Sequence, residues 1–405
     1  MNILVVSPFF PLPLTSGGHT RLYNLLKHMC SKHTVDFASL VSPPERESVA
    51  RLDGWFRKRV SFDPFGADGA SRRTGFFTKL MARGVDAARG IPPEASGFYF
   101  PELKEAVAGL LAESRYDVVQ VELTRMARCF PEDFFREHPS RKFLADYDLS
   151  YLPHQRDFEC ETRPARKAAK FINYRLHKSY AAKVWSLFDT LIVMSETDRK
   201  KALELIPGRD VQVVPNGVDL DAFRPGPRDA RGKRLLMLGG AMHPANVDGL
   251  KYFLREIFPA VREKVPDATL YVIGTGWDAL KGIVPEDGSV RLTGFLEDYA
   301  TCISDESVFI APIRIGGGTR LKILEAMALG VPVVTTRVGC EGLGAVEGTA
   351  LLAADASDEF ARRVCELLLD APLRERIAAA AYCHVKEHFS WEAIASKMEG
   401  LYDGS

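Results

Sequence analysis

The chain has 405 residues, of which 46% are hydrophobic and 26% are charged, and its 53 basic residues balance its 53 acidic residues. This length exceeds what one compact core usually holds, and it predicts two or three domains of a globular protein. The charge balance leaves no overall field that would attract nucleic acid, so we expect no nucleic-acid partner.

The cysteines and the first residues bear on the cellular compartment. Seven cysteines are scattered along the chain and none forms a Cys-x-x-Cys pair, which disfavours a disulfide framework and is typical of a reducing cytoplasm. The opening "MNILVVSPFFPLPLTSGG" lacks a cationic region and contains prolines. It therefore predicts a strand and a loop rather than a signal peptide. No apolar run is long enough to span a membrane, and we expect a cytoplasmic protein.

Short β-branched runs alternate with helical stretches in both halves of the chain. In the first half the predicted strands are residues 2–7, 33–41, 116–122, 142–148 and 190–195. In the second half they are residues 211–216, 234–240, 268–274, 289–294, 307–312 and 331–336. Continuous apolar strands between amphipathic helices indicate parallel sheets covered on both faces. The pattern predicts a doubly wound α/β domain that occurs twice.

The boundary between these domains is expected near residues 214–234, where an Asn-Gly turn, prolines and mixed charge are typical of an exposed linker. We assign residues 1–208 to an N-terminal domain and residues 209–387 to a C-terminal domain. Residues 388–405 are predicted to form a helix that returns to the first domain, with Ser390 as its N-cap.

The stretch "SVFIAPIRIGGGTRLKILEAMALG" (307–330) predicts a strand, a glycine turn and a helix. Glycines there let the backbone approach a ligand and leave N–H groups free at the helix start, which attracts phosphate. Lys322 adds a point charge and Arg320 a planar fork suited to phosphate oxygens. Glu325 could accept hydrogen bonds from the hydroxyls of a sugar. The alternative is a tight turn followed by a solvated helix face.

Residues 308–342 resemble the nucleotide-sugar site of the family-4 glycosyltransferases. Four further stretches occur in the family's order and spacing, namely "SETDRKKA" (195–202), "VVPNGVDLDAFRP" (213–225), "GGAMHPANVDGLKYF" (239–253) and "VRLTGFLEDYATCI" (290–303). The resemblance implies the GT-B architecture, in which two Rossmann-like domains face each other across a cleft. It also implies a retaining, metal-independent transferase without a cofactor. Such an enzyme moves a sugar from a donor such as a UDP- or GDP-sugar to an acceptor hydroxyl.

The resemblance assigns most donor contacts to the C-terminal domain. Glu325 matches the glutamate that holds the nucleotide ribose, and Phe295 lies where the backbone meets the base edge. The loop and helix start beside the diphosphate and the donor sugar are matched by Gly317, Gly318, Thr319 and Lys322.

In the N-terminal domain, Gly17 and Gly18 match the glycine-rich loop that faces the diphosphate. This domain is expected to bind the acceptor, which is a glycan, a lipid-linked molecule or a small alcohol.

The sequence differs from many family members at three places. Gly317 replaces the first of two glutamates, and His243 with Asn246 replaces an arginine and a lysine. Gln120 and Glu122 occupy the strand after which a catalytic histidine often follows.

His243 follows a strand, where a side chain would point toward the ligand. Because few other hydrogen-bond donors remain for the phosphates, we predict a catalytic set of Lys322, Glu325, His243 and Arg320.

Two groups are given structural interpretations. The carboxylates of "ADYD" (145–148) do not fill a magnesium shell alone, so we expect no metal there, and Asp148 is interpreted either as an acceptor contact or as part of a strand-end turn. His154, in "YLPHQR", is interpreted as a solvated loop residue.

Residues 163–185 contain seven basic residues and no acidic residue. Apolar side chains recur every four residues from Ala168 to Val184, which predicts a basic amphipathic helix. Such a helix is suited to peripheral contact with the inner face of an anionic membrane that carries a lipid-linked acceptor. Residues 71–83 form a second basic and aromatic patch. The alternative is a helix whose stripe faces the core and whose basic face is solvated.

Two other functions are compatible with the same residues. A nucleotide-sugar epimerase of the same fold would turn over the donor without an acceptor. A non-catalytic subunit that binds nucleotide sugar would explain the absent glutamate and histidine.

Overall fold

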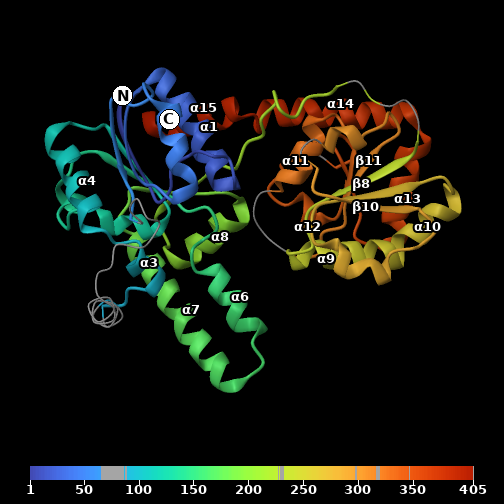
Figure 1. The fold of residues 1–405 in the computed structure, drawn as a ribbon, viewed down its shortest axis with the longest axis horizontal. Coiled ribbons are helices and arrows are strands. Elements are labelled where there is room, and N and C mark those ends of the chain that lie inside the picture. Colours follow the sequence, from blue (N-terminus) through green and yellow to red (C-terminus); the bar gives the residue numbers. More distant parts are fainter. Residues whose placement is uncertain are drawn as a thin grey trace. The chain divides into compact units, whose positions relative to one another are not determined.

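The computed structural model divides into two compact units, residues 1–215 with 395–405 and residues 216–394 (Figure 1). It describes residues 1–64, 86, 89–226, 228, 232–296, 299–315, 320–345 and 347–404. Each unit holds one parallel sheet with helices on both faces. The two doubly wound α/β domains predicted from the sequence are therefore confirmed.

The first unit contains a seven-stranded sheet in the order β3-β2-β1-β4-β5-β6-β7. Its strands are β1 (Asn2–Ser7), β2 (Thr34–Leu40), β3 (Lys58–Phe62), β4 (Val118–Glu122), β5 (Arg141–Ala145), β6 (Thr190–Val193) and β7 (Asp210–Val213). Val5 on β1 lies in register with Phe37 on β2 and Gln120 on β4. All pairings in this sheet are parallel, which fits strands that are buried on both faces.

The helices of the first unit cover this sheet and build its core. They are α1 (Gly17–Lys32), η1 (Pro43–Leu52), α3 (Pro93–Gly97), α4 (Pro101–Glu113), η2 (Thr124–Cys129), α5 (Phe134–Glu137), α6 (Leu152–Cys160), α7 (Pro164–Trp185) and α8 (Glu196–Leu205). The apolar side chains of Leu103, Val121 and Trp185 belong to one buried cluster that joins α4, β4 and α7. Helices α6 and α7 pack side by side as a hairpin whose tip projects from the sheet (Figure 1).

The second unit contains a six-stranded sheet in the order β10-β9-β8-β11-β12-β13. Its strands are β8 (Arg234–Leu238), β9 (Thr269–Ile273), β10 (Val290–Gly294), β11 (Val308–Ala311), β12 (Val333–Thr335) and β13 (Leu352–Ala353). The covering helices are α9 (Pro244–Tyr252), η3 (Phe253–Ile257), α10 (Phe258–Lys264), η4 (Trp277–Ile283), η5 (Tyr299–Cys302), α11 (Leu321–Ala328), α12 (Arg337–Cys340), α13 (Ser357–Leu369) and α14 (Ala371–His388).

Three strand assignments made from the sequence were wrong or missing. Residues 211–216 do not begin the second sheet, because β7 pairs with β6 at the edge of the first one. The division between the units accordingly falls after Pro215 rather than after residue 208. Strand β3 is polar and only half-buried, and β13 has two residues, so neither shows the continuous apolar run that marks an inner strand.

The last helix, α15 (Trp391–Asp403), begins where Ser390 caps it, since Ser390 Oγ accepts a hydrogen bond from Ala393 N at 3.1 Å. From residue 395 onward it belongs to the first unit. The buried Tyr402 hydroxyl lies 3.2 Å from Gln120 Oε1 on β4, and Arg141 Nη1 donates to the Tyr402 carbonyl oxygen at 2.8 Å. These contacts attach the C-terminal residues to the first sheet.

The second sheet depends on glycines where the loops after β8 and β9 meet. Gly239 and Gly274 have φ values of 136° and 143°, which side-chain-bearing residues rarely adopt. A Cβ on Gly274 would lie 2.6 Å from the carbonyl carbon of Gly239. Only a glycine fits there, because the backbone itself would have to move.

We expect Gly274→Ala to destabilise the protein by roughly 3 kcal/mol, because strain at positive φ adds to a backbone clash. Gly109→Ala is the matched control. Gly109 lies inside α4 and a Cβ there meets nothing within 4 Å, so it should stabilise by roughly 0.5 kcal/mol or more. Chemical denaturation of both variants tests this, and equal stabilities would contradict the proposed glycine contact.

Candidate functional site

The candidate site of the second unit lies at the carboxyl edge of its sheet, where loops follow β8, β10 and β11. In open parallel sheets the N-termini of the following helices lie along this edge, and ligands bind there. Helix α9 begins after the loop that follows β8, and α11 begins after the loop that follows β11. The predicted residues Gly317, Gly318 and Thr319 lie in that second loop but outside the described residues.

The centre of this edge is a hydrogen bond between the predicted Lys322 and Asn246. Lys322, in the first turn of α11, donates from Nζ to Asn246 Oδ1 at 2.6 Å. Asn246 is itself buried and donates from Nδ2 to the Gly240 carbonyl oxygen at 2.9 Å. A Cβ on Gly239 would lie 2.5 Å from Asn246 Nδ2. The glycine loop thus positions the side-chain amide of Asn246 through a hydrogen bond, and that amide positions the ammonium group of Lys322 through another.

Burial shifts the pKa values of two predicted residues on α11. It lowers the pKa of Lys322 to about 8, an effect increased by the neighbouring Arg320 and opposed by Glu325. It raises the pKa of Glu325 to about 7, against the effect of Lys322. Desolvation disfavours both charged forms, and the attraction between the two groups offsets this only in part. An anionic ligand would favour the charged form of Lys322.

Arg320 immediately precedes α11 and is almost fully buried. Its Nη2 donates to the Val338 carbonyl oxygen at 3.0 Å, and the guanidinium lies 3.9 Å from the Glu341 carboxylate. Both partners follow β12. Arg320 therefore joins the start of α11 to the loop after β12, and its contact with phosphate stays a prediction.

The two other predicted residues lie at the same edge with exposed side chains. His243 is the N-cap residue of α9, and its side chain makes no capping hydrogen bond. Phe295 directly follows β10 and is 75% exposed. Their roles toward a nucleotide stay predictions.

Two apolar residues at this edge were missed by the sequence reasoning. Met242 is 84% exposed after β8, and Ile315 is 61% exposed after β11. Large apolar side chains that project from several strand ends are typical of a ligand site rather than of an inert surface. The signal was available in the sequence, because each residue lies a few positions after an apolar strand.

The first unit presents its own glycines at the start of a helix. Gly17 and Gly18 are the first residues of α1, and Ser16 caps that helix by accepting from His19 N at 3.4 Å. A Cβ on Gly18 would lie 3.2 Å from the ring of Phe9 and 3.4 Å from the ring of Tyr147. Gly18 permits close packing, and the contact of Gly17 and Gly18 with a diphosphate stays a prediction.

Where many family members have a histidine after the fourth strand, this chain has a buried polar network. The Tyr147 hydroxyl donates to Glu122 Oε2 at 2.6 Å, and Gln120 Nε2 donates to Glu122 Oε1 at 3.0 Å. The guanidinium of the buried Arg21 lies 5.6 Å from the centre of the Tyr147 ring. Burial raises the pKa of Glu122. This carboxylate is committed to internal hydrogen bonds and is not presented to an acceptor.

A cavity of about 340 Å³ opens beside the carboxyl ends of β4 and β5 in the first unit. Asp146, the first carboxylate of "ADYD", is fully buried at its wall and accepts hydrogen bonds from Thr124 Oγ1 at 2.7 Å and Ser150 N at 3.1 Å. Asp146 is therefore a structural residue, whereas Asp148 lines the cavity. This cavity was not predicted from the sequence.

Comparison with known proteins places this geometry in a family. Residues 232–370 match the family model described as "Glycosyl transferases group 1". The chain is 25% identical over 408 residues to an "Uncharacterized 44.6 kDa protein in cps region" of Klebsiella pneumoniae, an alignment that covers 98% of each chain. It is 28% identical over 226 residues to the phosphatidyl-myo-inositol mannosyltransferase of Mycobacterium tuberculosis, which covers 52% of this chain and 58% of that protein. The chain thus spans little more than half the length of the mannosyltransferase.

Solved structures share the fold along the whole chain. Sucrose-phosphate synthase from Thermosynechococcus elongatus aligns with a TM-score of 0.66 and 16% identity, covering 100% of this chain and 98% of that one. Anabaena HepE in complex with UDP and glucose aligns with a TM-score of 0.62 and 15% identity, covering 100% of both chains. Residues 232–370 thus match the group 1 glycosyltransferases, and the whole chain shares the GT-B fold of the two solved structures.

Proposed function

We propose that the chain transfers a hexose from a nucleoside diphosphate sugar to a hydroxyl of a glycan or lipid-linked acceptor. Residues 232–370 match a family of glycosyl transferases, and the resemblance seen in the sequence implies a retaining enzyme that uses a nucleotide-sugar donor. The observation that carries the proposal is the partly buried Lys322 ammonium, which donates a hydrogen bond to Asn246 at the carboxyl edge of the second sheet. A cation in that position is suited to a diphosphate, because partial burial strengthens the attraction.

In this proposal the second unit binds the donor. Lys322 contacts the diphosphate, Glu325 accepts hydrogen bonds from the ribose hydroxyls, and exposed apolar residues such as Phe295 cover the base. The bond between the anomeric carbon and the diphosphate oxygen breaks, and a bond from the acceptor oxygen forms on the same face of the sugar. The acceptor proton goes to the leaving diphosphate, so no side-chain base is required. Catalysis then depends on positioning and on stabilisation of the leaving charge.

The first unit is proposed to bind the acceptor. The proteins to which the chain is similar suggest the class of acceptor. The matched Mycobacterium protein is a phosphatidyl-myo-inositol mannosyltransferase, and another relative in Corynebacterium glutamicum is described as a GDP-mannose-dependent enzyme acting on a phosphatidylinositol mannoside. HepE, in contrast, was solved with UDP and glucose. A lipid-linked acceptor and either a GDP- or a UDP-sugar are thus the first substrates to test.

Helix α7 supports contact with a membrane that carries such an acceptor. Of its predicted apolar stripe, Tyr180 and Val184 are buried in the core, whereas Ile172 is 68% exposed near the tip of the hairpin. Phe171 beside it is also exposed, and Arg166 and Lys167 are exposed in the preceding turn. The described residues include no helix long and apolar enough to cross a membrane. We therefore propose peripheral binding of the hairpin tip at the cytoplasmic face.

Lys322→Ala should lower kcat/KM by about 100-fold, because it removes the cation that stabilises the leaving diphosphate. Glu325→Ala should lower it by roughly tenfold or more, because it removes a charged acceptor for ribose hydroxyls. Lys264→Ala and Glu263→Ala, on the exposed face of α10, are the controls. Donor consumption should be measured with and without acceptor. Full activity in either α11 variant would exclude this site, and turnover without any acceptor would indicate an epimerase.

The affinity for a nucleotide sugar should be greatest between pH about 7 and about 8. Binding needs an ionised Glu325, whose pKa is about 7, and a protonated Lys322, whose pKa is about 8. Affinity should therefore rise as the pH approaches 7 from below and fall as the pH increases beyond 8. A nucleotide sugar is the right probe, since its diphosphate keeps its charge over this range.

Two conservative variants separate the limbs of this profile. Glu325→Gln should flatten the acidic limb, because its side chain does not titrate. Lys322→Arg should flatten the alkaline limb, because arginine stays protonated. Calorimetric titrations across the pH range measure both, and a profile that neither variant alters would contradict the assignment of these two groups.

The membrane proposal predicts that binding to liposomes increases with anionic lipid content, since basic side chains near such a surface each contribute about 1 kcal/mol. Ile172→Asp should weaken partitioning by about tenfold, because an exposed apolar side chain no longer enters the interface. Leu369→Asp is the matched control, as Leu369 is similarly exposed on α13 of the other unit. Flotation that depends neither on anionic lipid nor on Ile172 would rule out this contact.

A further inference from the structure

One wall of the cavity in the first unit contains a cluster that the proposed function does not use. Glu94 on α3, His154 on α6 and His177 on α7 each offer one ligand atom, and these three atoms lie within 4.8 Å of one another. The Nε2 atoms of His154 and His177 lie 3.5 Å and 3.8 Å from Glu94 Oε2. The prediction that His154 is a solvated loop residue is wrong, because it lies on a helix against this cluster.

The tautomer of His177 is fixed by its other nitrogen. His177 is buried, and its Nδ1 lies 2.9 Å from the Asn173 carbonyl oxygen. Because a carbonyl oxygen only accepts, Nδ1 carries the proton and Nε2 of the neutral ring presents a lone pair. Nε2 is buried without a hydrogen-bond partner and is directed toward the Glu94 carboxylate. A lone pair facing a carboxylate is unfavourable unless a cation lies between them.

His154 shares the same supporting residue. Its ring stacks on that of His177 with 3.6 Å between the ring centres, and its Nδ1 lies 3.1 Å from Asn173 Nδ2. With the amide in this orientation, His154 Nε2 carries the proton and donates toward Glu94. A half-turn of the amide brings Oδ1 to Nδ1, which then carries the proton and leaves a lone pair on Nε2. The Asn173 carbonyl oxygen thus fixes His177 in the tautomer that binds a metal, and the Asn173 side chain does the same for His154 only after that half-turn.

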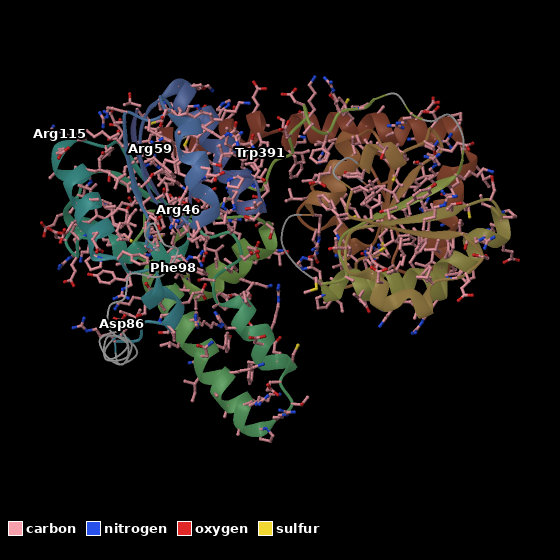
Figure 2. All side chains as sticks on the ribbon, in the orientation of Figure 1. Arg46, Arg59, Asp86, Phe98, Arg115 and Trp391 are labelled. Carbon is pink, nitrogen blue, oxygen red and sulfur yellow. The ribbon has the colours of Figure 1, made fainter. Side chains whose placement is uncertain are left out.

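Glu94 is oriented by a separate contact. Arg125 Nη1 donates to Glu94 Oε1 at 3.1 Å, which leaves Oε2 toward the histidines. The Arg125 guanidinium is held 4.1 Å above the ring of Phe98, which directly follows α3 and is labelled in Figure 2. Metal-binding histidines and carboxylates in proteins have such outer hydrogen bonds, which fix their orientation. All three side chains of this cluster have one.

We propose that Glu94, His154 and His177 bind a divalent transition-metal ion of the zinc class, which joins α3 to the α6–α7 hairpin. A tetrahedral zinc ion with bonds of about 2.0–2.2 Å separates its ligand atoms by about 3.3 Å. The distances of 3.5 Å and 3.8 Å to Glu94 Oε2 are close to that value, and the stacked rings of His154 and His177 have to turn so that both Nε2 atoms face one ion. Two histidines, one carboxylate and an open fourth position form a ligand set that zinc accepts.

The fourth position is available to an oxygen ligand from the cavity. Asp148 and Ser150 line the same cavity of about 340 Å³ as the three ligands. A water molecule or an oxygen of a molecule bound there would complete the coordination. All three proposed ligands belong to the first unit, and none of them is among the donor contacts proposed for the second unit. Zinc binding is also measured without donor or acceptor, so its result is independent of the proposed activity.

The test uses the full chain, freed of metal by chelation and then titrated with Zn²⁺ or Co²⁺. We expect one ion per chain, and with Co²⁺ we expect the visible absorption bands of a tetrahedral nitrogen and oxygen site. His177→Gln should abolish those bands and weaken Zn²⁺ binding by more than tenfold. His388→Gln is the matched control, because His388 is an exposed histidine at the end of α14. Circular dichroism establishes that each variant is folded.

Substitutions of Asn173 distinguish a metal site from a packed histidine pair. Asn173→Asp places a carboxylate beside His154 Nδ1, so it should preserve or strengthen Zn²⁺ binding. Asn173→Ala should weaken binding by about tenfold, which is the usual result of removing an outer hydrogen bond. The proposal is overturned if the wild-type chain binds no stoichiometric Zn²⁺. It is equally overturned if the His177 and His388 variants bind the ion alike, because the histidine pair would then have a packing role only.

Discussion

The partial burial of the Lys322 ammonium at the carboxyl edge of the second sheet is the constraint on which the candidate donor site depends. Removing a cation from water is unfavourable, and the lowered pKa of Lys322 reflects this. The protein offsets the cost with the Asn246 amide oxygen and with the nearby Glu325, whose own charged form is also disfavoured. The site is therefore incomplete electrostatically until an anion binds, and this makes a diphosphate a fitting ligand.

The glycines around Asn246 are needed for the same reason. Asn246 reaches Lys322 only because Gly239 leaves room for the amide, and Gly239 keeps its conformation only because Gly274 has no Cβ. A structural requirement of the backbone and the position of a charged group are thus linked through close contacts. A substitution in this glycine loop would therefore displace the Lys322 ammonium group. It would weaken ligand binding in this way even if the substituted residue itself does not contact the ligand.

The two sheets share a topology but use their carboxyl edges differently. In the first unit the corresponding region contains a buried network around Glu122, whose carboxylate accepts from Tyr147 and Gln120. The exposed polar groups instead lie around the cavity beside β4 and β5. The absence of a histidine directly after β4 agrees with the proposed reaction, in which the leaving diphosphate receives the proton. Two histidines of this unit, His154 and His177, lie on helices that line the cavity.

The sequence by itself determined the architecture and the neighbourhood of the donor site. Most strands were predicted because inner strands of parallel sheets are continuous apolar runs, and Lys322 and Glu325 were predicted because their spacing after a strand is local information. Only the tertiary structure decided that Asn246 holds Lys322, that Glu122 is buried, and that β7 belongs to the first sheet. It also brought together Glu94, His154 and His177 from three helices. Such contacts join residues far apart in the chain, and their partners are set by how helices pack on a sheet rather than by any local pattern of residues.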